Sequence, residues 1–222
     1  YPHAAFPYLD LVETNGRRSR DELEYELLDT GVFADNRYFD VFVEYAKASP
    51  DDLLIRIEVF NRGPEPAALH VLPTLWFRNT WSWGDDVPKP VLSNDAGRVH
   101  AFHPDLGDCT LQIDGERDLL FTENESNAQR LWGQPNASPY VKDAFHSYVV
   151  SGTRDAVNPA RTGTKAAARY TLEVPAGGSR AVRVRLTLAP STASFRDFDG
   201  VFRDRMHNAD EFYERITPAS LT

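Results

Sequence analysis

The segment Arg37-Tyr-Phe-Asp-Val-Phe-Val-Glu-Tyr-Ala46, followed by Leu53-Leu-Ile-Arg-Ile-Glu-Val59, carries the clearest structural pattern in the chain. In the first segment, apolar side chains from Phe39 to Tyr45 recur at every second position. A period of two places these side chains on one face of an extended strand and the intervening polar residues on the other. The second segment repeats the pattern, and turn-forming residues at 48–52 join the two. The sequence therefore predicts a β-hairpin with charged cross-strand neighbours.

Further strands are predicted after this hairpin. Leu69, Val71, Leu75 and Phe77 continue the inward-facing series, and Pro73 predicts an edge position or a bulge because proline lacks an amide donor. Similar patterns predict strands at 97–103, 108–113, 117–122, 145–150, 165–174 and 180–188. The 15 prolines and 13 glycines are spread along the chain, as many strands separated by turns require. The predicted fold is mainly β, a large antiparallel β-sandwich.

The period changes near the end of the chain. From Phe195 to Ile216, apolar residues recur at steps of three and four, which predicts one amphipathic helix. Ser194 and Asp197 have the spacing of an N-terminal capping box, and Pro218 ends the helix. This helix either links the sandwich to a following domain or folds back on its own sheet.

Composition argues against several classes of partner. With 24 basic and 33 acidic residues, the net charge of −9 disfavours nucleic acid, whose phosphates need a basic surface. The longest apolar runs fall far short of the ~18 residues that a membrane span requires, so no membrane partner is expected. Cys109 is the single cysteine and no signal peptide opens the chain, so we expect a cytoplasmic location. The chain begins at Tyr1 without an initiator methionine, which indicates a piece of a longer protein.

The sequence predicts neither a metal site nor a cofactor. His100 and His103 fall on opposite faces of a predicted strand and therefore cannot share an ion. Asp85 and Asp86 are adjacent and diverge, which favours solvated loop residues over ligands of a hard cation. Cys109 lies in a predicted strand and is interpreted as a small apolar residue.

Glu123-Asn-Glu125 is the best local pair of acids for glycosidic chemistry. In an extended segment the two side chains share a face, loosely compatible with the ~5–9.5 Å that separates an acid and a base carboxyl. Such spacings arise by chance among 33 acids, so the pair receives no catalytic assignment. A less favoured alternative is a sugar-converting enzyme of the aldose epimerase type that uses His146 with Glu123.

The segment Leu75-Trp-Phe-Arg-Asn-Thr-Trp-Ser-Trp83 has the most unusual composition, with three of the four tryptophans. Aromatic faces stack on sugar rings while Arg and Asn hydrogen-bond hydroxyls, which predicts a saccharide-lined cleft. The alternative places Trp76 and Phe77 in the core and Trp81 and Trp83 against a neighbouring domain. A second cluster of similar composition is predicted to meet the first at one end of the sandwich. The candidate substrate or domain-interface residues are Trp76, Arg78, Asn79, Trp81, Trp83, Asn124, Asn127, Asn136, Tyr140, Lys142 and Asp143.

Five strings carry a family resemblance. They are Leu27-Leu-Asp-Thr-Gly-Val-Phe33, Arg37-Tyr-Phe-Asp-Val-Phe-Val-Glu-Tyr-Ala-Lys47, Leu72-Pro-Thr-Leu-Trp-Phe-Arg-Asn-Thr-Trp-Ser-Trp83, Asn136-Ala-Ser-Pro-Tyr-Val-Lys-Asp143 and Asp155-Ala-Val-Asn-Pro159. Together they resemble the N-terminal region of bacterial glycoside hydrolase family 63 proteins, relatives of the mannosyl-oligosaccharide glucosidases. The resemblance covers essentially the whole chain.

This resemblance implies a super-β-sandwich that precedes an α/α toroid catalytic domain, which hydrolyses α-glucosidic linkages with inversion. It also implies that the general acid and base belong to the toroid. Residues 1–190 are then a non-catalytic sandwich, and residues 191–222 a helical linker toward the toroid. The sandwich is expected to pack on the toroid and to shape its cleft for an oligosaccharide or glucoside. A stand-alone carbohydrate-binding module is the alternative function.

Overall fold

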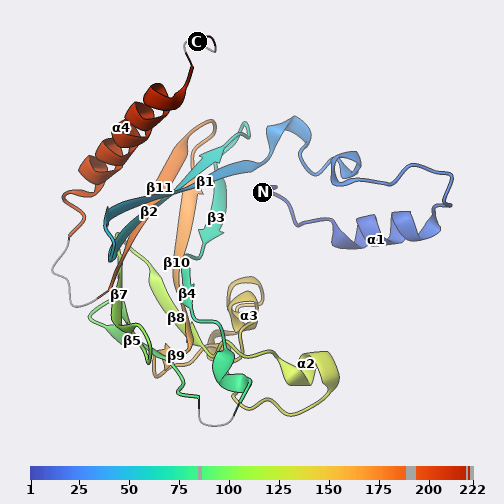
Figure 1. Cartoon of the computed structure of the whole chain (residues 1–222). Helices are drawn as coiled ribbons and strands as arrows, with labels where there is room; N and C mark the ends of the chain where they lie inside the picture. Colours follow the sequence, from blue (N-terminus) through green and yellow to red (C-terminus); the bar gives the residue numbers. More distant parts are fainter. Residues whose placement is uncertain (85–86, 189–193, 219, 221–222) are drawn as a thin grey trace. The chain divides into compact units, whose positions relative to one another are not determined.

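The computed structural model describes residues 1–84, 87–188, 194–218 and 220, and it is mainly β (Figure 1). The α-helices are α1 (Tyr8–Arg17), α2 (Ala128–Trp132), α3 (Ala144–Val150) and α4 (Phe198–Ile216). The strands are β1 (Phe39–Ser49), β2 (Asp52–Asn61), β3 (Ala67–Val71), β4 (Thr74–Trp76), β5 (Val91–Asp95), β6 (Arg98–His103), β7 (Gly107–Ile113), β8 (Asp118–Thr122), β9 (Thr162–Gly163), β10 (Lys165–Val174) and β11 (Ser179–Leu188). No helix in these ranges is long and apolar enough to cross a membrane.

The strands form two antiparallel sheets. The larger has seven strands in the order β1-β2-β11-β7-β6-β5-β9. In the smaller, β10 lies between β3 and β4 in the strand order and also pairs with β8. β8 contacts β5 and β9 of the larger sheet. The predicted antiparallel β fold with a C-terminal helix is confirmed.

The chain divides into two compact units. Unit 1 comprises Tyr1–Val43, Ile57–Leu69 and Thr171–Val182, and unit 2 comprises Glu44–Arg56, His70–Tyr170 and Arg183–Thr222. The predicted boundary at residues 190 and 191 lies outside the described residues.

In unit 1, the buried Asn61 fixes the turn that follows β2. Its side-chain amide donates to the carbonyl oxygens of Glu65, at 2.8 Å, and of Val174, at 3.0 Å. Its side-chain oxygen accepts the Gly63 N–H at 2.8 Å. One amide thereby satisfies three backbone groups that a turn leaves without ladder partners.

In unit 2, the first half of α4 packs on the end of the β1–β2 hairpin. Phe198 and Phe202 form a core cluster with Ala46 and Leu54. Ala46 and Leu54 lie on the face that the period of two assigned to polar residues. The helix therefore folds back on its own sheet over its first turns.

The sequence predicts that the hairpin face carrying Phe39 and Tyr45 packs inward. This prediction is wrong at Tyr45, which is 64% exposed. The polar face accepts α4 because its charges compensate each other. Arg56 pairs with Glu44 at 2.7 Å across the strands, as the predicted charged neighbours require. Its guanidinium also lies over the Phe202 ring, 4.5 Å from the ring centroid.

The predicted capping box at the start of α4 is wrong. Asp197 is the N-cap residue, but its side chain makes no capping hydrogen bond. Its carboxylate instead accepts hydrogen bonds from Arg185 at 2.7 and 3.2 Å. The helix begins at Phe198 and ends at Ile216, in agreement with the stop at Pro218.

Residues 145–150 form α3, so the predicted strand there is wrong. Phe145 and Tyr148 are three apart on the helix and pack with Leu120 and Ala167. Alternation over six residues cannot distinguish such a pair from a strand face. The other predicted strands correspond to observed ones, and β3 and β4 are separated at Pro73, as expected.

Candidate functional site

The tryptophan segment of unit 2 follows β4 as an exposed aromatic surface. Trp76 ends β4 and Trp83 is 65% exposed. The guanidinium of Arg78 lies over the Trp83 ring, 4.6 Å from its centroid. Asn79 precedes a single turn of 3-10 helix, where its carbonyl oxygen accepts the Ser82 hydroxyl. Trp76 is 54% exposed and therefore lies outside the core, unlike in the alternative interpretation.

Trp81 differs from its two neighbouring tryptophans. It is half-buried, and its indole N–H is buried without a hydrogen-bond partner in the described part of the chain. Buried indole N–H groups are usually satisfied. This donor is therefore available to an acceptor brought by a ligand or a packing partner.

The second predicted cluster is a hydrogen-bonded network around α2. Asn127 caps this helix by accepting the Arg130 N–H at 3.0 Å, and it donates to the Asp143 carboxylate at 3.3 Å. Asn136 donates to the side-chain oxygen of Asn127 at 3.1 Å, and Asp143 also pairs with Arg130. These polar groups hold the loop together, which explains the Asn-rich composition without a ligand.

Asn124 joins the two predicted clusters. Its side-chain amide donates to the carbonyl oxygen of Phe77, at 3.0 Å, in the tryptophan segment. Tyr140 and Lys142 contribute backbone carbonyl groups. The Tyr140 carbonyl oxygen accepts a hydrogen bond from the Glu123 N–H, and the Lys142 carbonyl oxygen accepts one from the Lys165 ammonium at 2.8 Å. The structure thus brings the two clusters to one region of unit 2.

Lys89 occupies the position between the two local carboxylates. Its ammonium lies 2.9 Å from Glu123 and 3.1 Å from Glu125. Burial alone would lower the pKa of Lys89, but the hydrogen bonds to both carboxylates outweigh it and raise the pKa. Glu123 also accepts the Thr164 hydroxyl at 2.7 Å. Both acids are therefore held as ion-paired carboxylates.

The histidines His100, His103 and His146 lie in different surroundings. His100 bonds Asp108 at 2.9 Å, whereas the His103 ring lies against Phe77. His146 is exposed on α3, and in the described ranges no hydrogen bond or ion pair joins it to Glu123. No group of three metal-ligating side chains is present among these residues. Asp85 and Asp86, considered above as cation ligands, lie outside the described residues.

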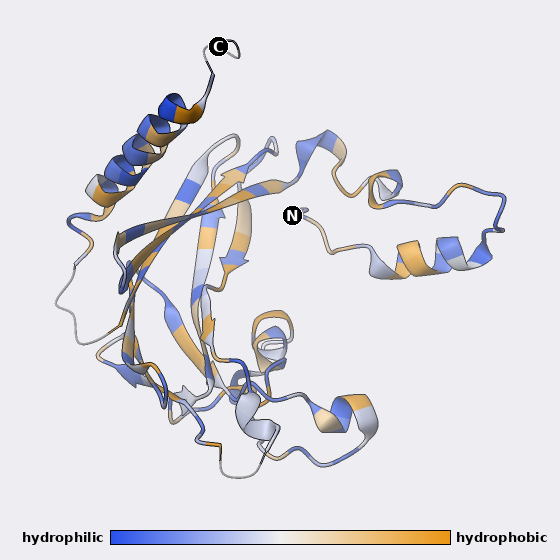
Figure 2. Ribbon diagram, in the orientation of Figure 1, coloured by the Kyte–Doolittle hydropathy of each residue, from blue (hydrophilic) through white to orange (hydrophobic). Residues whose placement is uncertain are grey.

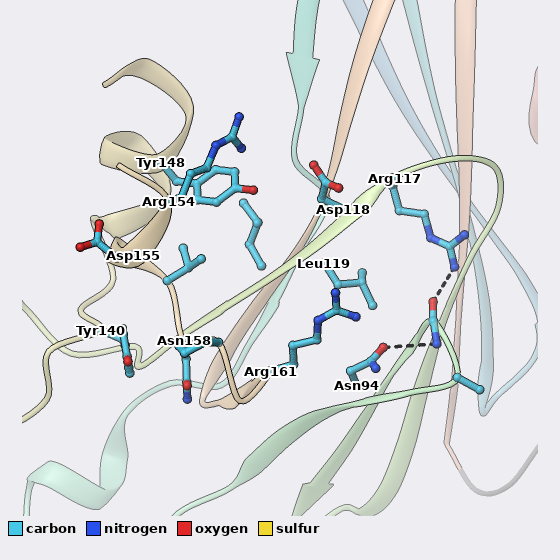
Figure 3. A pocket seen from close by; sticks show the side chains of 15 residues that line it. Asn94, Arg117, Asp118, Leu119, Tyr140, Tyr148, Arg154, Asp155, Asn158 and Arg161 are labelled. Carbon is cyan, nitrogen blue, oxygen red and sulfur yellow. Dashed lines mark hydrogen bonds between the residues drawn. The ribbon is translucent and has the colours of Figure 1, made fainter. Parts of the chain in front are cut away.

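A cavity of about 660 Å³ opens beside this region in unit 2 (Figure 3). Its walls are the β5–β6 turn, the start of β8, the Tyr148 side of α3, and the segment from Arg154 to Arg161. Tyr140 is the only predicted site residue among its described lining residues. The polar lining comprises Asn94, Arg117, Asp118, Tyr140, Tyr148, Arg154, Asp155, Asn158 and Arg161.

Sequence reasoning missed the arginines of this cavity. Arg117 is distant in the sequence from Arg154 and Arg161, and the three arginines form no motif with one another. One sequence feature could have indicated two of them. The string Asp155-Ala-Val-Asn-Pro159, which supports the family resemblance, lies between Arg154 and Arg161. The three side chains line the same cavity because the segment from Arg154 to Arg161 lies beside the start of β8.

The chain is similar to a curated protein of yeast. No protein-family model matches the chain. The chain is 36% identical, over 265 aligned residues, to the uncharacterized protein YMR196W of Saccharomyces cerevisiae. The alignment covers 98% of this chain and 24% of the yeast protein. The chain therefore spans about a quarter of the length of this curated relative.

Proposed function

We propose that this chain is a non-catalytic β-sandwich domain of a larger, α-glucosidase-like glycoside hydrolase. It packs on an α/α toroid catalytic domain and helps to wall the saccharide cleft of that domain. The observation that carries the proposal is the C-terminal half of the apolar face of α4, which is exposed in a chain spanning about a quarter of its curated relative. The five strings that resemble family 63 supply the class of enzyme.

One apolar stripe runs along α4 and changes environment halfway. Phe198 and Phe202 are buried, whereas Met206 and Tyr213, which continue the stripe at helical spacing, are exposed. Figure 2 shows hydrophobic residues interspersed with hydrophilic ones along this helix. A helix gains most of its stability in proteins from packing of its apolar face. The C-terminal half of α4 therefore fits a docking surface for a following domain.

The carboxylates of this region support a non-catalytic role. An inverting glycosidase needs one protonated carboxyl for the leaving oxygen and one carboxylate that activates water. Lys89 bridges Glu123 and Glu125 at 2.9 and 3.1 Å, so an ammonium group, rather than a substrate or a water molecule, lies against both carboxylates. The acid and the base then belong to the partner domain, and this chain contributes shape and water exclusion.

The exposed aromatic surface supports a place at the cleft wall. Trp83 with Arg78 stacked on it presents a flat apolar face beside hydrogen-bond donors, a combination suited to sugar rings. The same observation favours one alternative, a stand-alone carbohydrate-binding module. That module would bind saccharide without any partner domain.

Amide hydrogen exchange tests the docking of α4. The amides of residues 206–216 are compared between this chain alone and the full-length product of its gene. We expect fast exchange in the chain alone and strong protection in the full-length protein, because buried helix amides open less often. Equally fast exchange in both proteins would contradict the docking.

Calorimetric titration separates the domain from the module. The chain alone is titrated with gluco-oligosaccharides, and Trp83→Ala serves as the variant. We expect no saturable heat, since one wall of a cleft gives few contacts. Saturable heat that is lost in Trp83→Ala would instead favour the module.

A further inference from the structure

The cavity beside β8 is rich in cationic side chains, although the chain as a whole carries a net charge of −9. Arg117, Arg154 and Arg161 line it, with Asp118 and Asp155 as the lining acids. Asp118 is compensated by Arg169, whose Nε lies 3.1 Å from its carboxylate. Figure 3 shows Asp155 pointing away from Arg161. The charge that faces the cavity is therefore positive.

The three guanidinium groups differ in how they are held. Arg117 donates to the carbonyl oxygens of Gly97 and Gly115, which fix its position and leave its charge uncompensated. Arg154 lies over the ring of Tyr148, 4.5 Å from its centroid. Within the described ranges no ion pair or hydrogen bond holds the Arg161 side chain. Arg154 and Arg161 thus keep donors free for an anion.

The backbone of Arg161 is in a conformation that arginine rarely adopts. Its φ is +54°, in the left-handed region where a side chain is disfavoured and glycine or asparagine is usual. The conformation is held by the Arg161 N–H, which donates to Asn158 at 3.1 Å, and by its carbonyl, which accepts the Asn94 N–H at 3.1 Å. Such outliers cluster at ligand sites, where the structure around them maintains the strain.

The other lining groups suit a small polar ligand body. Figure 3 shows Arg161 between Asn158 and Asn94, and both asparagines line the cavity. Asn158 is itself rigid, because it donates to the Thr162 carbonyl at 2.7 Å and accepts the Ala160 N–H. A cavity of about 660 Å³ falls within the usual size of ligand pockets.

We propose that this cavity binds a monosaccharide-sized organic anion, whose carboxylate or phosphate group is held by Arg161, while Arg154 and Arg117 add positive charge to other parts of the lining. Guanidinium groups match the geometry of both oxyanions, and charge-assisted hydrogen bonds are the strong ones. The inference uses only the cavity and is independent of the proposed function.

Titration calorimetry of the intact chain tests this inference, with glucose 6-phosphate and glucuronate as the anionic probes and glucose as the neutral one. At least one anion is expected to bind saturably, roughly tenfold or more tightly than glucose, and more weakly as salt is raised. The stronger of the two anions identifies the group as phosphate or carboxylate. Absence of saturable binding for both anions, or equal binding of glucose, would overturn the proposal.

Three variants assign the binding to the cavity. Arg161→Gln is expected to weaken the anion about tenfold, while the exposed Arg180→Gln, which changes the net charge equally, leaves it unchanged. Arg161→Gly removes the guanidinium and suits the positive φ, so it tests the site even if Arg161→Gln fails to fold. It should keep or raise the melting temperature while binding weakens. An equal loss in Arg180→Gln, or unchanged binding in Arg161→Gly, would contradict the assignment.

Discussion

Arg185 shows how one buried charge organises the surrounding unit. Its side chain is 3% exposed, although the alternating pattern of β11 assigns it to the polar face. It pairs bidentately with Asp52 at 2.8 and 2.6 Å and with Asp197 at 2.7 Å. The hydrogen bonds to Asp52, and then those to Asp197, raise the pKa of Arg185 against the effect of burial. Arg185 thus connects the start of β2 to the start of α4.

Replacing Arg185 tests this role. Arg185→Met is expected to lower the free energy of unfolding by about 3–5 kcal/mol, because it leaves Asp52 with an uncompensated charge at a largely buried position. Urea unfolding measures the loss. Arg180→Met on the same strand is the control, and since Arg180 is exposed it should stay within about 0.5 kcal/mol of the wild type. Equal effects of the two variants would refute the buried role.

Asp197 gives the same contact a pH dependence. The hydrogen bonds from Arg185 lower the pKa of Asp197 in the folded state. Between this lowered pKa and the unfolded value of about 3.9, the unfolded state binds more protons, so stability falls as the pH decreases. Asp197→Asn should therefore be less stable than the wild type at pH 6, with a difference that shrinks below about pH 4. Urea midpoints across this range test it, and a pH-independent difference would contradict the linkage.

Two of the three phenylalanines of helix α4 lie in opposite environments. Phe202 is 5% exposed in the cluster with Ala46 and Leu54, whereas Phe212 is 57% exposed. The helix therefore has one half stabilised by the sheet and one half that solvent surrounds in the chain alone.

These two residues form a matched pair. Phe202→Ala should cost about 3–5 kcal/mol of unfolding free energy through lost burial and the cavity left behind. Phe212→Ala should change it by less than about 0.5 kcal/mol. Chemical denaturation of the chain alone measures both, and a large effect of Phe212→Ala would show that the second half is already packed.

Strand β9 depends on a close backbone approach at Gly163. A Cβ atom there would lie 2.3 Å from the carbonyl oxygen of Thr122 and 2.8 Å from its carbonyl carbon. Both atoms belong to the backbone of β8, which cannot move without disturbing its pairing with β10. Glycine at this position lets the two strands meet.

Gly163→Ala should therefore destabilise the protein by about 1–3 kcal/mol. Gly16→Ala is the control, because a Cβ at Gly16 meets nothing within 4 Å and alanine favours the helix. Thermal unfolding compares the two variants. A neutral Gly163→Ala would show that β8 and β9 separate easily.

The local sequence pattern predicted which segments form strands and helices better than it predicted which of their residues are buried. The hairpin of β1 and β2 and most other strands follow from alternation and turn residues. The face covered by α4 could not be predicted, because Ala46 and Leu54 become core only when Phe198 and Phe202 arrive from the other end of the chain. The same holds for Arg185, whose ion pairs with Asp52 and Asp197 join two other elements to β11, and for α3, which is too short for its period to be decisive.

The candidate site was predicted in part for the same reason. The tryptophan segment and the Asn-rich loop are local compositions, and the Asn124 amide brings them together. The network of Asn127, Asn136 and Asp143 turned out to hold the loop itself. The arginine cavity needs three segments to converge, which no local spacing reveals.

At the level of the complete chain, two features favour a part of a larger enzyme. The apolar stripe of α4 is half covered, and the paired carboxylates Glu123 and Glu125 are bound to Lys89. A self-sufficient hydrolase would need an open acid and base pair, and a self-sufficient domain would cover its helix. In the proposal, the toroid supplies the acid and the base and covers the exposed half of α4.

Glucose release from α-linked gluco-oligosaccharides, measured side by side for this chain and for the full-length product of its gene, tests the proposed division of labour. We expect no release by the chain alone, because the proposal places the acid and the base in the toroid, and release of β-glucose by the full-length protein, as inversion requires. Turnover by the chain alone, abolished by Glu123→Gln, would contradict the proposal and assign the chemistry to this sandwich.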